Sequence, residues 1–203
     1  MRNEQIKKIA FTGIIIGLII VMSFTMLGFI PMASGASITL VHIPVLIGAM
    51  VLGKKYGTVL GLIFGICSLI LAFMNVATNA PFTNPIVSIL PRIAFGFLVC
   101  PLYNMFKKLI KNDIASTAVT MCVATFIHTI IVLVPMYIIW RTGFYFGVSD
   151  YTAQYGDGAG TNLFLIIFGI LLANGLIEIA LAGLIGTPIA MAMKVVIKQN
   201  KVE

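Results

Sequence analysis

The chain has 203 residues, of which 60% are hydrophobic and only 9% carry a charge. Soluble globular domains carry roughly one quarter charged residues, so this composition excludes a soluble protein and predicts an integral membrane protein. The net charge of +7 could suggest a nucleic-acid partner, but the basic residues stand in twos and threes at the ends of apolar runs, which argues against nucleic acid.

Six apolar runs follow one another along the chain, and each predicts one helix. A membrane helix needs roughly 17 to 25 residues, so the length allows an all-α membrane protein with six transmembrane helices in one bundle, a single domain over residues 1–203. The first run is too long for a signal peptide, and we expect it to remain as a helix. The runs are Ile6 to Ile30, Leu40 to Leu52, Gly57 to Met74, Pro85 to Phe106, Ile114 to Trp140 and Asn162 to Ile197.

The second run is too short to cross a bilayer as a helix. Leu40 to Leu52 would rise only about 20 Å, whereas the hydrocarbon core is about 30 Å thick. We therefore expect a short second helix that tilts, starts as an irregular buried stretch, or ends before the far interface.

Positive charge assigns the two sides of the bundle. With six spans, every lysine and Arg2 fall on one side, and Arg141 is the basic residue of the opposite connections. Because positive residues favour the cytoplasmic side, we expect both termini in the cytoplasm. The outer side then carries the two long connections, Pro31 to Thr39 and Arg141 to Thr161, and loops of this length are more often lids or binding loops than idle connectors.

Small residues recur four apart in three of the runs, which lets another helix approach closely. In the third and sixth runs we expect these contacts inside the bundle. In the first run, a contact inside the bundle and a contact with a partner protein in the membrane both stay open. The residues are Gly13 and Gly17 with Ala10 in the first run, Gly57, Gly61 and Gly65 in the third, and Ala182 and Gly186 in the sixth.

One arginine, Arg92, lies inside the fourth run, with no acidic neighbour in the sequence. A guanidinium stays charged, and placing it in a membrane span costs at least roughly 2.5 to 3.5 kcal/mol. Either an internal carboxylate or an anionic ligand must offset this cost. If Pro85 marks the outer end of the run, Arg92 lies about 10 Å below that interface.

Other polar side chains interrupt the outer halves of the runs and are candidate binding residues. Asn174 and Glu178 share a helix face, about 18 Å and 24 Å below Asn162. We expect no comparable polar set in the cytoplasmic half. The candidates are His42, Asn84, Arg92, His128, Asn174 and Glu178, with Trp140 at the outer end of the fifth run.

Several of these candidates also have a purely structural interpretation. Arg92 and Glu178 could neutralise each other, although their expected depths differ by about 14 Å. His42 and His128 could each be a core histidine bonded to a neighbouring carbonyl.

Asn84 and Trp140 have structural interpretations of their own. Asn84 precedes a proline and could simply start a helix, and Trp140 could anchor the chain at the membrane interface.

The spacing of reactive side chains disfavours metal binding, disulfides and catalysis. The two histidines lie in different runs, and Cys67, Cys100 and Cys122 stand alone among apolar residues. No nucleophile is paired with a base, and no phosphate loop is present. We therefore expect no enzyme activity, no metal and no cofactor in this chain.

Four segments carry more specific motifs. They are Ile38 to Ala49 with its His-Ile-Pro motif, the turn from Gly53 to Gly57, the glycine pair of Gly61 and Gly65, and Asn84-Pro85 through Leu90-Pro91-Arg92. Together they resemble the substrate-binding S components of energy-coupling factor vitamin transporters. The resemblance extends over nearly the whole chain, and it is strongest to pantothenate-type members, followed by the cobalamin type.

The resemblance implies a six-helix protein that captures a vitamin at its outer face. It implies that the chain then joins a transmembrane T subunit and two ATPase subunits, which hydrolyse ATP and drive release into the cytoplasm. The implied mechanism is toppling of the whole chain in the bilayer while outer loops close over the ligand. Small residues on the first helix of the family contact the T subunit, a region that holds Ala10, Gly13 and Gly17 here.

Charge narrows the choice of vitamin. A cationic vitamin such as thiamine would require surplus acid or an aromatic cage, whereas the outer polar set offers Arg92 and two histidines against Glu178. Pantothenate has a carboxylate for Arg92 and hydroxyl and amide groups for the histidines and asparagines. We therefore expect pantothenate. Cobalamin or riboflavin, a stand-alone permease, a membrane enzyme and a purely structural bundle are the alternatives.

Overall fold

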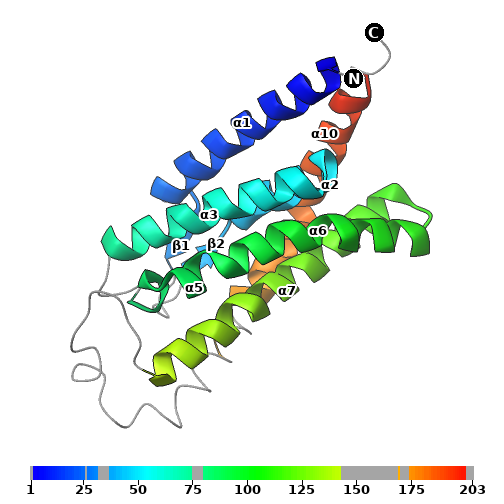
Figure 1. Cartoon of the computed structure of the whole chain (residues 1–203). Helices are drawn as coiled ribbons and strands as arrows, with labels where there is room; N and C mark the ends of the chain where they lie inside the picture. Colours follow the sequence, from blue (N-terminus) through cyan, green and yellow to red (C-terminus); the bar gives the residue numbers. More distant parts are fainter. Residues whose placement is uncertain are drawn as a thin grey trace.

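The computed structural model describes residues 2–25, 27–31, 37–74, 80–142, 169 and 174–199, and these are helical apart from one short hairpin (Figure 1). The first half contains α1 (Arg2–Phe24), β1 (Phe29–Pro31), β2 (Ser37–Thr39), α2 (His42–Leu52) and α3 (Lys54–Met74). The second half contains the 3-10 turn η1 (Ala80–Thr83), α5 (Pro85–Ser88), α6 (Leu90–Leu109), α7 (Asp113–Thr142), a helix over 174–181, the π-helical η2 (Ala182–Gly186) and α10 (Thr187–Gln199).

Five helical segments of the described chain are long and apolar enough to cross a membrane: Glu4–Phe24, Lys54–Met74, Pro85–Leu109, Asp113–Ile139 and Asn174–Ile197. One further apolar helix, α2, has only 11 residues. The prediction of a short second helix is therefore confirmed. Its burial also explains how it can be short, because every residue of α2 except Val51 is buried by the surrounding helices.

The first connection differs from the predicted one. Helix α1 ends at Phe24, although the apolar run continues to Ile30, because Phe29–Pro31 pairs with Ser37–Thr39 as an antiparallel hairpin. Residues 143–161, most of the second long connection, lie outside the described residues.

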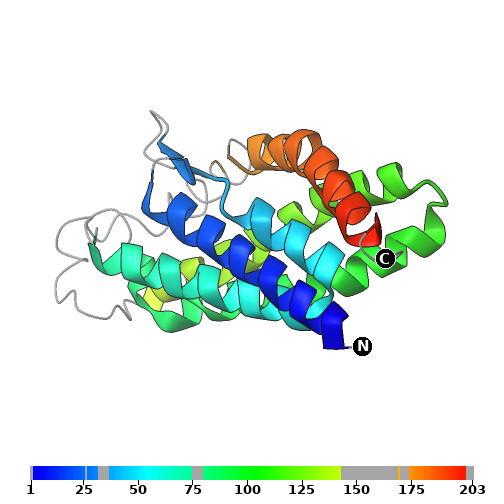
Figure 2. The same ribbon diagram turned by 90° about the horizontal axis from the view of Figure 1, so that it is seen from above.

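The two ends of the bundle differ in what they carry. Helix α1 begins and α10 ends at one end, which we call the terminal end, and the α6–α7 turn lies there too (Figure 1). Figure 2 shows the β1–β2 hairpin at the opposite end, which we call the hairpin end. The α2–α3 turn also lies at the terminal end, where Gly53 has a φ of 103° that favours glycine.

Helices α3 and α6 pack backbone to backbone through glycines. A methyl group added at Gly57 or Gly61 would meet the carbonyl oxygen of Gly96 or Arg92, and one at Gly65 would meet the backbone at Ile89. The prediction that these small residues pack inside the bundle is therefore confirmed for the third run. Gly186 is also internal, because its added methyl would meet Met121 and Ile43.

The glycines of α1 have a different environment. Gly13 and Gly17 are exposed, and a methyl group added at either would meet nothing within 4 Å among the described residues. Ala10 is exposed too. Within the part of the chain that the structure describes, this face of α1 is therefore open and has no packing contact that explains its small residues.

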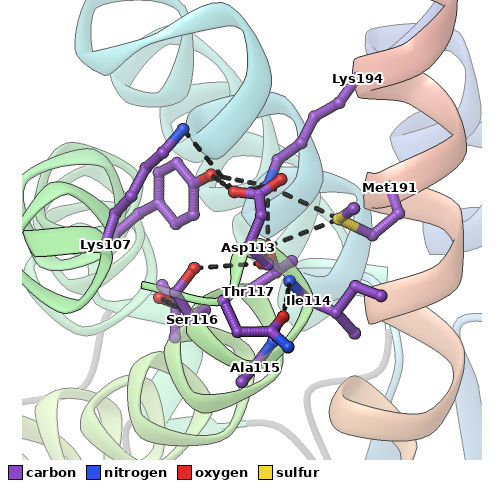
Figure 3. Close-up of polar contacts among 11 residues, drawn as sticks. Lys107, Asp113, Ile114, Ala115, Ser116, Thr117, Met191 and Lys194 are labelled. Carbon is purple, nitrogen blue, oxygen red and sulfur yellow. Dashed lines mark hydrogen bonds and ion pairs between the residues drawn. The ribbon is translucent and has the colours of Figure 1, made fainter. Parts of the chain in front are cut away.

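A polar cluster joins α10 to the α6–α7 turn at the terminal end (Figure 3). Lys194 Nζ donates to the hydroxyls of Tyr103 at 2.6 Å and Thr117 at 2.7 Å. Its ammonium lies 3.3 Å from the carboxylate of Asp113, which also accepts from Tyr103 at 2.8 Å and pairs with Lys107 at 3.6 Å. The expectation that the end of the bundle with the chain termini lacks a polar set is therefore wrong.

The glycine contact between α3 and α6 can be tested by substitution. Gly61→Ala should lower the melting temperature of the detergent-purified chain, because the new methyl group would press on the Arg92 carbonyl. Overpacking of this kind costs about 1 to 3 kcal/mol. Gly13→Ala is the matched control, and it should melt no lower than the wild type because its methyl group meets open space. Equal melting temperatures for the two variants would contradict the close contact.

Candidate functional site

A break in the helix fixes Arg92 in place. In a continuous helix the N–H of residue 91 would donate to the carbonyl of Val87, but Pro91 has no N–H and its ring crowds that turn. The helix accordingly stops at Ser88 and resumes at Leu90. The freed carbonyl of Val87 instead accepts a hydrogen bond from Arg92 Nη1. The Leu-Pro-Arg sequence thus directs the guanidinium back toward the preceding turn.

The Arg92 guanidinium is buried without a carboxylate partner. The residue is only 5% exposed, and its Cζ lies 5.0 Å from the ring centre of Phe82 and 5.7 Å from that of Phe64. No ion pair among the described residues includes Arg92, and its Nε has no hydrogen-bond partner there. The structural pair with Glu178 is therefore not formed.

The two histidines stack on each other beside the guanidinium. The ring centres of His42 on α2 and His128 on α7 are 5.5 Å apart, with 18° between the planes. Phe95 on α6 lies 4.5 Å from the His128 ring, and Phe64 on α3 lies 5.9 Å from it. Because Phe64 also contacts Arg92, the histidines and the guanidinium belong to one cluster built by four helices.

The histidines differ in their hydrogen bonds. His42 Nε2 lies 3.3 Å from Thr125 Oγ1. Neither ring nitrogen of His128 has a hydrogen-bond partner in the described part of the chain, although the residue is only 5% exposed. Buried polar atoms rarely lack a partner, and a neutral imidazole has one donor and one acceptor. His128 can therefore offer both to a ligand.

Asn84 starts a helix, as its structural interpretation from the sequence predicted. Its Oδ1 accepts from the N–H of Ile86 at 2.9 Å, and Pro85 follows as the first residue of α5. Asn84 is fully buried beside the turn that carries Val87. It therefore helps to place the carbonyl that binds Arg92.

Asn174 and Glu178 lie at the start of the described part of the last helix, and both are buried. Glu178 Oε1 accepts from the backbone N–H of Thr39 at 2.6 Å. Glu178 thus lies level with the last residue of the hairpin, only one helical turn from Asn174. The expected depth of about 24 Å assumed a helix starting at Asn162, which lies outside the described residues.

The backbone of Trp140 continues α7, but its side chain lies outside the described part of the structure.

Four members of the cluster were not sequence candidates: Phe64, Phe82, Phe95 and Thr125. Thr125 could have been found, because it precedes His128 by three residues and so shares its helix face. The phenylalanines carry no such signal, since an aromatic residue in an apolar run is expected everywhere.

The cluster has the chemical groups that a small anion with polar groups would require. It offers one permanent positive charge, imidazole donors and acceptors, and aromatic faces, all of them buried except the half-buried Phe82. Among the described residues, no group of three His, Cys, Asp or Glu could hold a metal ion.

Two comparisons with known proteins show what the chain is similar to. A family model for the "ECF transporter, substrate-specific component" matches residues 7–190. The chain is also 22% identical to the "Pantothenic acid transporter PanT" of Lactococcus lactis subsp. cremoris (strain MG1363), over 95% of this chain and 96% of that protein. The family is one of transport components and not of enzymes. With most of its length matched and its apolar helices in place, the chain belongs to the substrate-specific components of ECF transporters.

Proposed function

We propose that the chain is the vitamin-binding subunit of an energy-coupling factor importer and that its vitamin is pantothenate. The family supports the role in uptake, and the name of the Lactococcus relative supports the choice of vitamin. The chemistry of the cluster supports the same choice, because pantothenate combines a carboxylate with hydroxyl and amide groups.

The observation that carries the proposal is the buried guanidinium of Arg92. It has no carboxylate within 4.0 Å among the described residues, and one carbonyl and two aromatic faces only partly compensate its burial. A ligand carboxylate would complete the compensation with a charge-assisted, bidentate pair. His128, whose ring nitrogens have no described partner, would bind the polar groups of the same ligand.

The charge distribution supports an orientation with both termini in the cytoplasm. Lys54, Lys107, Lys108, Lys111 and Lys194 gather at or near the terminal end, and positive residues favour the cytoplasmic side. The hairpin end, with Glu178 and the hairpin strands, then faces outward. Pantothenate would enter there.

The family also suggests the partners. A T subunit and two ATPase subunits would energise transport, so this chain would need no cofactor of its own. The open face of α1 with Ala10, Gly13 and Gly17 offers a close-packing surface for a transmembrane partner. Release by toppling of the whole chain would use that contact.

The role of Arg92 can be tested with two ligands that differ in one charge. We expect the purified wild type to bind pantothenate much more tightly than the neutral alcohol pantothenol. Arg92→Ala should weaken pantothenate binding by about 2 kcal/mol or more, roughly thirtyfold, and should affect pantothenol far less. Isothermal titration of both ligands to both proteins measures this. Lys54→Ala is the control. It removes a positive charge at the terminal end, away from the cluster, and the variant should bind both ligands like the wild type.

Two outcomes of these titrations would count against the proposal. Equal affinity of the wild type for the acid and the alcohol would exclude an ion pair with Arg92. When the same titration is extended to riboflavin and cobalamin, binding of either one in place of pantothenate would keep the family role and replace the vitamin.

His128→Phe separates a ligand contact from a core histidine. The phenyl ring keeps the stacking against His42 and Phe95 but has no ring nitrogen. If the nitrogens bond the vitamin, affinity should fall about tenfold while the melting temperature is kept or rises, since a buried polar group is removed. Unchanged affinity would assign His128 to the core alone.

Uptake by whole cells tests the dependence on partners. Cells that express the chain should accumulate labelled pantothenate only when the T subunit and the ATPase subunits are also present. Cells that lack those subunits should bind the vitamin at their surface without accumulating it. Accumulation in their absence would instead identify a stand-alone permease.

A further inference from the structure

The buried carboxylate of Glu178 has a backbone partner and no cation. Its Oε1 accepts from the N–H of Thr39 at 2.6 Å, and the residue is only 7% exposed. No ion pair among the described residues includes Glu178. The carboxylate of Glu178 is therefore bound to the β1–β2 hairpin, through strand β2, which lies far from Glu178 in the sequence.

The geometry of the hairpin explains why Thr39 is the residue that Glu178 binds. Leu40 N–H donates to Gly28 O across the hairpin at 2.8 Å, and donors along a strand point alternately to opposite sides. The N–H of Thr39 therefore points away from β1, toward the free edge of β2. In a two-stranded sheet this edge has no further strand, and such a donor needs another partner when it is buried.

The bond between Glu178 and Thr39 also lies close to the start of α2. Only Leu40 and Val41 separate Thr39 from His42, the first residue of α2. Leu40 is held at both of its backbone groups, because its N–H donates to Gly28 O and its carbonyl accepts from the N–H of Ile43 at 3.0 Å. A shift of β2 would therefore be passed to the His42 ring, which stacks on His128.

We infer that Glu178 is a positioning residue, which holds β2 through the Thr39 N–H and thereby sets the His42–His128 pair, and that it does not itself bind the vitamin. This inference rests on the proposed function, which supplies the vitamin that the two histidines would bind. It assigns Glu178 a role different from the ligand contact expected from the sequence. It also agrees with charge, since a carboxylate pointed at an anionic vitamin would repel it.

Four substitutions separate the two roles. Glu178→Ala removes the acceptor, whereas Glu178→Gln keeps a carbonyl that can accept from Thr39. Thr39→Pro removes the donor on the free edge, where proline is tolerated, and Thr39→Ser is the matched control that keeps the N–H. The double variant Glu178→Ala with Thr39→Pro completes a cycle.

The first measurement is amide hydrogen exchange of the hairpin in the purified chain without vitamin. Loss of a hydrogen bond to a charged acceptor should speed exchange at Thr39 about tenfold in Glu178→Ala and much less in Glu178→Gln. This readout needs no ligand. Unchanged exchange in Glu178→Ala would overturn the inference, whatever the vitamin is.

The second measurement is the affinity for pantothenate. Glu178→Ala and Thr39→Pro should each weaken binding about tenfold, and the double variant should be no weaker than either, because both remove the same bond. Glu178→Gln and Thr39→Ser should bind like the wild type. Additive losses, or a loss in Glu178→Gln equal to that in Glu178→Ala, would overturn the inference and favour a direct contact. Failure of the wild type to bind pantothenate would instead refute the proposed vitamin, and the exchange experiment would still decide the role of Glu178.

Discussion

The close approach of α3 and α6 is the contact on which the binding cluster depends. Gly61 lies against the backbone of Arg92 itself, so the distance between the two helices fixes the position of the residue that carries the charge. Membrane helices gain no hydrophobic energy from contact with each other, and small residues allow the close packing that replaces it. Phe64, on the same face of α3, meets the guanidinium from the side. A larger residue at Gly61 would therefore displace the site as well as loosen the bundle.

The buried positive charge of Arg92 forms no ion pair with any carboxylate among the described residues. Glu178 is buried too, yet it bonds to the hairpin and not to Arg92. A carbonyl and two aromatic rings hold the guanidinium in its orientation, and each is a weak partner compared with a carboxylate. Under the proposed function, such a site would trade stability for ligand affinity, which is a common feature of functional sites. It would also discriminate by charge, because a cationic ligand would face a guanidinium that has no carboxylate partner among the described residues.

Sequence reasoning found the helices and the polar candidates because both stand out in an apolar chain. It extended α1 to Ile30, since Phe29 and Ile30 are as apolar in a strand as in a helix. It missed Phe64 and Phe95, because apolar residues give no sign of which ones border a site. It also missed the bond between Lys194 and Asp113, which are 81 residues apart and both near run ends, where charges are expected. Partners across the bundle depend on packing angles that no periodicity encodes.

The burial of α2, from which only Val51 is excepted, has a consequence for how the protein is made. An 11-residue helix rises only about 16 Å, roughly half of the hydrocarbon thickness, so it has no stable position of its own across a bilayer. We expect it to reach its place only when α1, α3 and α6, the helices that cover most of it, are present, so that it packs late in assembly. Because α2 carries His42, the site is complete only in the fully assembled bundle. Partly inserted chains would therefore lack the proposed site, and under the proposed function vitamin binding would report on biogenesis as well as on transport.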